Sequence, residues 1–277
     1  MLSKKTQDSQ FPVFVSASFF LVVPILVLAF IARRTPQPYT PAESYQAAVR
    51  DAEQPNSAHT APSLVTVSFG QKVTVVSWTQ GKKVSDYKQN ASAPKDTWVT
   101  LVPNLKSFCQ DYVKAHGPDS TQLTERLEQR LGLPLHSGND RFIELTVTPK
   151  SISEFFRPCS DPDPAKKTCE VARPCWEANV DGSTCLPRTS ALLKGDLDDP
   201  KKKQELENRY WSLNQYYRSF ASQNQYPWTF LGYTFDWARN EAADDLVRFG
   251  ESEFVIPAGA PIHYVSDTDT VTYCSPQ

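Results

Sequence analysis

The sequence predicts an α+β domain with a mainly antiparallel sheet and a few helices, stapled by disulfides and carried by a single N-terminal transmembrane helix. Three observations lead to this prediction. Residues 11–32 form a long run without charge, all six cysteines lie from Cys109 onward, and short alternating segments are mixed irregularly with helical ones. Because strands and helices do not alternate regularly, a parallel βαβ arrangement is disfavoured.

The uncharged run predicts the membrane anchor. A helix over residues 11–32 spans about 33 Å, which is enough for a hydrocarbon core of about 30 Å. A cleaved signal peptide is the alternative, with residues 27–29 as its cleavage site. The run is longer than the roughly 7–15 residues of a signal h-region. We therefore expect residues 11–32 to stay on the mature protein and to contact the lipid bilayer.

The prediction divides the chain into four parts. Residues 1–10 are an N-terminal tail, residues 11–32 the transmembrane anchor, residues 33–62 a proline-rich linker, and residues 63–277 the extracytoplasmic α+β domain. The linker contains five prolines, few large apolar residues and a short helix-capable patch near residues 42–52. Such a composition is typical of a semi-rigid spacer.

The cysteines decide on which side of the membrane we expect the domain. Basic residues flank the anchor at both ends, so the positive-inside rule gives nearly a tie. An even number of cysteines, all in the soluble part, favours disulfides in an oxidising compartment, on the periplasmic or extracellular side. The six are Cys109, Cys159, Cys169, Cys175, Cys185 and Cys274.

Four of these cysteines lie in one loop, residues 158–190, that is rich in proline and has little periodicity. If the loop cysteines pair among themselves, Cys109 is left to join Cys274. Their spacing lacks the close pairs that a zinc site needs, so we expect no metal site.

The local patterns predict the following elements. Alternating or β-branched segments predict a hairpin over residues 63–69 and 72–79, and strands over residues 97–102, 141–147, 229–237, 253–256, 262–265 and 271–274. Helical periodicity predicts helices over residues 104–116, 120–131 and 199–222.

An aromatic run near the C-terminus is the strongest candidate binding site. It contains Trp228, Phe230, Tyr233, Phe235 and Trp237. The spacing of these residues changes phase at Gly232, which predicts a β-bulge there. One half of the run would then pack in the core, while the other half would face outward and bind a sugar ring or a partner protein. A run that lies wholly in the core is the alternative.

No complete catalytic constellation is found in the sequence. Carboxylates at residues 161 and 163, at residues 196–199 and at residues 267 and 269 could supply a general acid and base. Each group lies beside prolines or in a polar loop, where solvated turns are favoured. Residues 250–253 resemble half of a nucleophile elbow but lack its second glycine. The net charge of -2 argues against nucleic acid as the partner.

Together these features favour a non-catalytic, membrane-anchored domain that binds a partner protein or assembles with other membrane subunits, without a cofactor. A binder of cell-envelope glycans that uses the 228–237 run is the first alternative. A hydrolase that uses loop carboxylates is the second.

Overall fold

The computed structural model describes residues 39–54, 56–171, 225–240 and 243–276, together with the backbone of residues 173–174 and 185–186. They belong to one compact unit, Tyr39–Gln277. The predicted anchor at residues 11–32 and the predicted helix at residues 199–222 lie outside the described residues. Among the helices described, none is both long and apolar enough to cross a bilayer.

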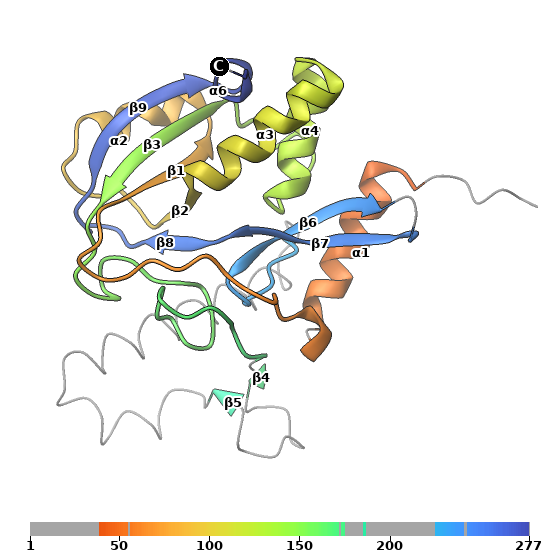
Figure 1. Ribbon diagram of the computed structural model, residues 1–277, viewed down its shortest axis with the longest axis horizontal. Helices are drawn as coiled ribbons and strands as arrows, with labels where there is room; N and C mark the ends of the chain where they lie inside the picture. The colour runs from red at the N-terminus through yellow and green to blue at the C-terminus, as the bar shows by residue number, and fades with distance from the viewer. Residues whose placement is uncertain are drawn as a thin grey trace, which may run out of the picture. The chain divides into compact units, whose positions relative to one another are not determined.

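A five-stranded sheet in the order β8-β2-β1-β3-β9 forms the centre of the fold (Figure 1). Each pair of neighbouring strands is antiparallel. The strands are β1 (Val73–Thr79), β2 (Thr97–Leu101), β3 (Arg141–Val147), β8 (Phe254–Ile256) and β9 (His263–Asp269). The prediction of an α+β domain with an antiparallel sheet is therefore confirmed.

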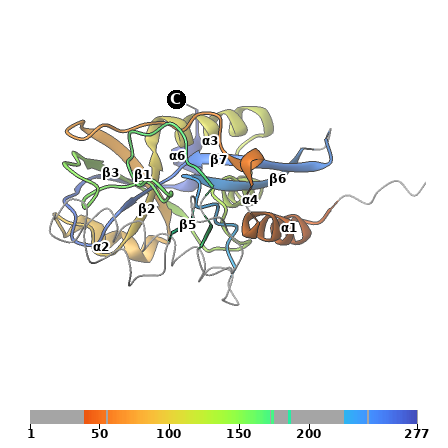
Figure 2. The same ribbon diagram turned by 90° about the horizontal axis from the view of Figure 1, so that it is seen from below.

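Helices lie on both faces of this sheet. Helix α2 (Val84–Lys88) covers one face, and α3 (Val102–His116), α4 (Ser120–Arg130) and α6 (Thr270–Cys274) cover the other. Figure 2 shows α2 and α3 on opposite sides of the strands. Alternation along β1 explains both contacts, since Val75 packs with Tyr87 of α2 while Val76 packs with Leu105 of α3.

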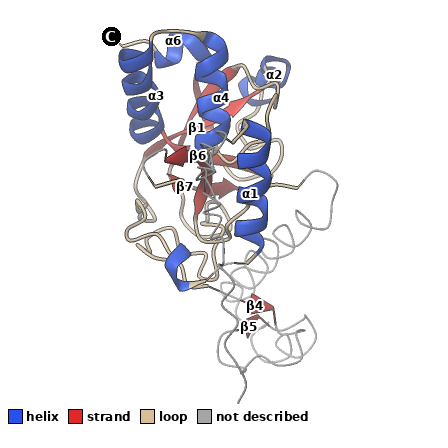
Figure 3. Cartoon of the chain, turned by 90° about the vertical axis from the view of Figure 1, so that its right-hand side faces the viewer, coloured by secondary structure: helices blue, strands red, loops and turns tan. Residues whose placement is uncertain are grey.

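A two-stranded antiparallel ribbon, β6 (Tyr233–Asn240) and β7 (Asp245–Ser252), extends from the edge of the sheet. Only Glu253 separates β7 from β8, so the ribbon continues the edge strand (Figure 1). Helix α1 (Pro41–Glu53) packs on β6, as Figure 3 shows. A short parallel pair, β4 (Arg173–Pro174) and β5 (Cys185–Leu186), completes the described strands.

Helix α1 lies within the segment assigned to the linker, so the compact unit begins before residue 63. The Thr40 side chain accepts from the backbone N–H of Glu43, whose carboxylate binds Thr40 in return. This capping box fixes the start of the helix. Its buried face carries Tyr45 and three small side chains, which pack on Phe235 and Trp237. Small residues give a weak hydrophobic signal in the sequence, and the partner surface is distant along the chain.

Two disulfides fasten the described residues. Cys109 of α3 is joined to Cys274 of α6, which confirms the predicted pairing. Cys159 is joined to Cys169 within the loop, in agreement with the expectation that loop cysteines pair among themselves. Cys175 and the side chain of Cys185 lie outside the described residues.

The predicted hairpin over residues 63–79 is wrong in its first half. Residues 63–69 form no strand, and β1 pairs instead with β2 and β3. The backbone N–H of Leu64 donates to the carbonyl of Lys167, and that of Val67 donates to Pro164. The loop closed by the Cys159–Cys169 disulfide thus takes the hydrogen bonds that a hairpin partner would have taken.

Two further predictions differ from the structure at the C-terminal end, and one strand there has no counterpart in the predictions. Residues 271–274, predicted as a strand, belong to helix α6, because the Asp269 side chain caps the backbone N–H of Thr272. The strand predicted over residues 229–237 begins only at Tyr233. Strand β7 was not predicted, since its sequence alternates poorly and includes Arg248 at a positive φ of 70°.

A buried carboxylate joins the ribbon to α4. The Asp236 side chain is 0% exposed and accepts two hydrogen bonds from Arg126, at 3.0 and 2.7 Å. Arg130 lies within 3.5 Å of the same carboxylate and also binds Glu251 of β7, at 2.7 Å. Because Asp236 has two guanidinium partners, its charge is compensated in an interior where an unpaired charge would be costly.

Replacement of Asp236 by Asn should lower the free energy of unfolding by about 3 kcal/mol, since it leaves the half-buried Arg126 without its carboxylate and Arg130 with Glu251 alone. Asp111→Asn is the matched control, because the Asp111–Lys114 pair is exposed and is expected to contribute less than about 1 kcal/mol. Urea denaturation of the purified full chain measures both values. Equal losses in the two variants would show that the buried network does not hold the ribbon.

Candidate functional site

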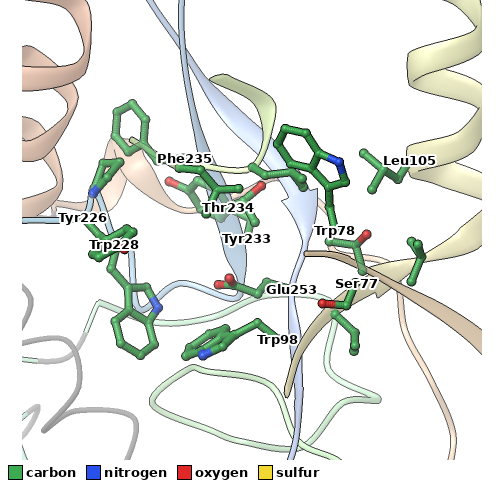
Figure 4. A pocket seen from close by; sticks show the side chains of 17 residues that line it. Ser77, Trp78, Trp98, Leu105, Tyr226, Trp228, Tyr233, Thr234, Phe235 and Glu253 are labelled. Atoms are coloured by element: carbon green, nitrogen blue, oxygen red, sulfur yellow. The ribbon is translucent and has the colours of Figure 1, made fainter. Parts of the chain in front are cut away.

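A cavity of about 600 Å³ lies where the β6–β7 ribbon meets the five-stranded sheet (Figure 4). One wall comes from β1 and β2, and the facing wall comes from β6 and residues 226–228. The first turn of α3 and the residues that follow α4 contribute apolar side chains, Leu105, Leu131 and Leu133. Glu253, the residue between β7 and β8, also lines the cavity. The site therefore exists only where segments from separate parts of the chain come together.

Aromatic side chains form much of the lining. The indoles of Trp98 and Trp228 meet edge to face, with their ring centroids 4.4 Å apart. The indole of Trp78 is held by a hydrogen bond from its Nε1 to the Thr270 hydroxyl, at 2.9 Å. Tyr226 is 41% exposed and lies on the outer side of the lining. Rings fixed in this way present apolar faces to a ligand at little cost in conformational entropy.

Two polar atoms in the lining are buried without a hydrogen-bond partner among the described residues. They are the hydroxyl oxygen of Thr100 and the indole Nε1 of Trp228. A buried polar group without a partner costs about 1–3 kcal/mol. Native structures contain few such groups, so each one calls for a physical reason. A ligand that supplies the missing partners is one such reason.

Glu253 is the only lining residue with a carboxyl group among the described residues. Figure 4 shows this carboxyl pointing toward the ring of Trp228, with Trp98 on another side. Burial raises the pKa of Glu253 from 4.5 to about 8, although the positive charge of Arg157 acts in the opposite direction. At neutral pH the side chain is therefore mainly a neutral carboxylic acid, which can donate a hydrogen bond.

Arg157 supports the floor of the site without lining it. Its side chain is 0% exposed and donates to the backbone carbonyls of Gly232, at 3.0 Å, and Val65, at 2.6 Å. Its guanidinium group also lies 4.5 Å from the centre of the Phe254 ring. Burial lowers the pKa of Arg157 to about 10, so the group still carries its charge at neutral pH. These contacts make Arg157 a structural cation that positions the turn before β6.

The structure divides the predicted aromatic run between the cavity and the core. Trp228, Tyr233 and Phe235 line the cavity. Phe230 and Trp237 are 3% and 0% exposed and do not line it. The Trp237 indole donates to the carbonyls at the end of α4, and the Tyr233 hydroxyl donates to the backbone of the residues after α1. Of the three members of the run that line the cavity, only Trp228 is not also a core residue.

Gly232 lies at the point where the aromatic run changes phase. Its φ of +74° is the left-handed conformation that glycine tolerates best. A Cβ atom there would lie 2.6 Å from Cδ of Arg157 and 2.9 Å from Sγ of Cys169. The glycine precedes β6, and its carbonyl accepts from the backbone N–H of Glu253 at 2.9 Å. Gly232 lies in a turn before the strand, so the predicted β-bulge at this position is wrong, although the positive φ explains why a glycine is needed there.

Sequence reasoning missed Trp98, Thr100 and Glu253. Trp98 and Thr100 are alternate residues of β2, and the sequence does not tell which face of that strand is covered. Glu253 carries a weak signal, since it is an acid that directly precedes the apolar residues of β8. Residues 250–253 resemble part of a nucleophile elbow, and in that motif the last residue has no binding role.

Some of the carboxylates proposed for acid–base chemistry are among the described residues, and none of these lines the cavity. Asp161 and Asp163 accept from backbone N–H groups in their own loop, as solvated turns do. Asp267 binds Lys88 and Arg141, and Asp269 caps α6. Residues 196–199 lie outside the described residues. Among the described side chains, no group of acids, histidines and cysteines is arranged to hold a metal ion.

Comparison of the chain with protein-family models, with curated proteins and with solved structures finds no match. The interpretation of this cavity therefore rests on its own geometry and chemistry.

Replacement of Gly232 by Ala should destabilise the chain by more than the roughly 1–3 kcal/mol that a residue held at positive φ costs. Gly259→Ala is the matched control, because Gly259 has a φ of +83° but no atom within 4 Å of its Cβ position. The difference between the two melting temperatures isolates the steric conflict with Arg157. Equal melting temperatures would show that Arg157 moves aside freely.

The buried carboxyl of Glu253 should make stability depend on pH. Between pH 4.5 and about pH 8 only the folded chain keeps this proton, so its contribution to stability falls as the pH rises through that window. Glu253→Gln removes this dependence. Its stability relative to the native chain should therefore increase from about pH 5 to about pH 8.5, as measured by urea denaturation at each pH. A constant difference would mean that the carboxyl is ionised and solvated.

Proposed function

We propose that this chain is a membrane-anchored binding protein whose extracytoplasmic domain holds a small, ring-bearing organic ligand in the cavity between β2 and β6. The cavity itself is the observation that carries the proposal. It combines fixed aromatic faces with the unpartnered polar atoms of Thr100 and Trp228. Its volume of about 600 Å³ falls within the range of about 300–1,000 Å³ that is typical of small-molecule sites.

The placement outside the cytoplasm is a further part of this proposal. The disulfides Cys109–Cys274 and Cys159–Cys169 support it, because such bonds persist in oxidising compartments and are rare in the cytosol. The anchor at residues 11–32 keeps its support from the sequence, through its length and its lack of charge.

The groups in the cavity support binding better than hydrolysis. Glycoside hydrolysis with two carboxyl groups needs a pair about 5–9.5 Å apart. The described lining contains the carboxyl group of Glu253 alone. Ser77 also lines the cavity, but no histidine does so among the described residues, and a serine nucleophile needs an adjacent base.

The binding of a partner protein, which the sequence favoured first, stays a prediction. The large apolar side chains that are exposed in the described part of the chain come from several different segments: Tyr39, Val65, Phe69, Tyr226, Val247 and Val265. Of these, Tyr226 belongs to the lining of the cavity. The cavity therefore gives a more specific starting point for experiments than the surface does.

Trp228→Ala and Trp237→Ala should separate binding from stability. Trp237 is fully buried, so its truncation should cost about 3–5 kcal/mol of folding free energy. Trp228 is half-buried in the lining, so its truncation should cost much less but abolish ligand binding. Thermal melting of the full chain gives the first effect, and ligand-observed NMR with a mixed library of ring-bearing small molecules gives the second.

Two outcomes would contradict the proposed function. Equal and severe destabilisation by both variants would show that Trp228 is a core residue like Trp237. A set of bound library members that is unchanged by Trp228→Ala would place binding outside the cavity.

A further inference from the structure

The polar atoms of the cavity restrict the chemical class of its ligand. We propose that the ligand is an uncharged sugar ring, which stacks on the indoles of the cavity and exchanges hydrogen bonds with Thr100, Trp228 and Glu253. This inference rests on the proposed binding function and names the ligand class of the same site. It is carried by the juxtaposition of apolar rings with two buried polar atoms that have no hydrogen-bond partner among the described residues, on Thr100 and Trp228, and with the carboxyl group of Glu253.

Thr100 and Trp228 give the first constraint. Thr100 is 5% exposed, and its hydroxyl oxygen is buried without a partner among the described residues. Strand alternation places Thr100 on the same face of the sheet as Trp98 and, through its register with Val76, on the face that the cavity borders. The indole N–H of Trp228 can only donate. A ligand must therefore offer a hydrogen-bond acceptor to the indole N–H and a hydrogen-bonding group to the hydroxyl.

Glu253 gives the second constraint. No hydrogen bond or ion pair of its carboxyl group is found within the described part of the chain. The cation of Arg157 acts on it from behind the turn, and Tyr226 and Tyr233 line the same cavity. The Tyr233 hydroxyl is already used, since it donates to the His59 carbonyl at 2.6 Å. Because burial raises the pKa of Glu253 to about 8, the carboxyl enters a neutral complex as a donor.

Other ligand classes fit these groups less well. A purely aromatic ligand would cover the rings but leave the polar atoms of Thr100 and Trp228 unpaired in a dry site. An organic cation is attracted to aromatic faces, but it cannot accept from the indole N–H and would need Glu253 to ionise. An anion would lose its hydration in a largely apolar cavity whose described lining offers no cation, since Arg157 donates to backbone carbonyls and does not line the cavity. A sugar ring has an apolar face for the indoles and hydroxyl groups at its rim that both donate and accept.

The test uses the purified full chain and ligand-observed NMR with four probe sets. They are uncharged oligosaccharides (cello- and N-acetylchito-oligomers), anionic oligogalacturonates, alkylammonium ions, and indole derivatives. We expect the uncharged oligosaccharides to bind best. Tight binding of alkylammonium ions or indoles, with weaker or no binding of uncharged saccharides, would overturn the sugar assignment while leaving the proposed binding function intact. If no probe in any set binds in a manner sensitive to Trp228→Ala, the proposed function itself fails.

Variants of the polar groups provide the second readout. Thr100→Val keeps the shape but removes the hydroxyl, so saccharide affinity should fall about five- to tenfold, while Thr100→Ser should retain it. Trp228→Phe keeps a ring but loses the N–H, and a similar loss is expected. A saccharide affinity that is unchanged by both Thr100→Val and Trp228→Phe would contradict the proposed hydrogen bonds.

The dependence of binding on pH tests the role of Glu253. Saccharide binding by the native chain should weaken as the pH rises through about 8, because ionisation removes the donor. Glu253→Gln keeps a donor that does not titrate, so its binding should be independent of pH in this range. Binding by the native chain that strengthens with rising pH would show that the ionised carboxylate is the binding form, and the assignment to an uncharged ligand would fail.

Discussion

The cavity depends on the buried carboxylate of Asp236, which holds the β6–β7 ribbon against α4. Two arginines on successive turns of that helix bind it, and one of them also reaches Glu251 on the neighbouring strand. Burying one carboxylate without partners would be costly, whereas two arginines and two carboxylates in one network compensate each other. The same contact sets the distance between the ribbon and the sheet, and so leaves room for the cavity between them.

A second constraint acts where the chain enters β6. Arg157 fills the space in front of Gly232, and its guanidinium group binds backbone carbonyls on three segments, with the Cys159–Cys169 disulfide alongside. A side chain at position 232 would displace the arginine. The carbonyl of Gly232 then accepts a hydrogen bond from the backbone N–H of Glu253. A structural cation, a glycine and a disulfide therefore place Glu253, whose carboxyl is the only one among the described lining residues, beside Trp228.

These two constraints also explain the electrostatic character of the site. The strong charges of this region are used within the framework: Arg126 and Arg130 bind Asp236, and Arg157 binds carbonyl groups. The cavity retains aromatic rings, a hydroxyl, an indole N–H and a carboxyl group that burial keeps protonated. Such a lining supports the proposal of a neutral, amphipathic ligand.

The sequence by itself determined the α+β class, the strands β1, β2, β3 and β8, the first part of β9, the helices α3 and α4, and the link between Cys109 and Cys274. These features follow from local periodicity, from capping and turn residues, and from the count of cysteines, all of which are read within one segment or by elimination. It also identified Gly232, because a change of phase in an aromatic run is a local signal.

Only the tertiary structure decided the rest. Local periodicity tells which residues share a face but not what covers that face, so Trp228 lines a cavity while Trp237, in the same run, is core. Residues 63–69 have the pattern of a strand, yet the disulfide loop took their hydrogen bonds. Trp98, Thr100 and Glu253 acquire a common role only because β2 and the junction of β7 with β8 come together across more than half of the domain's sequence.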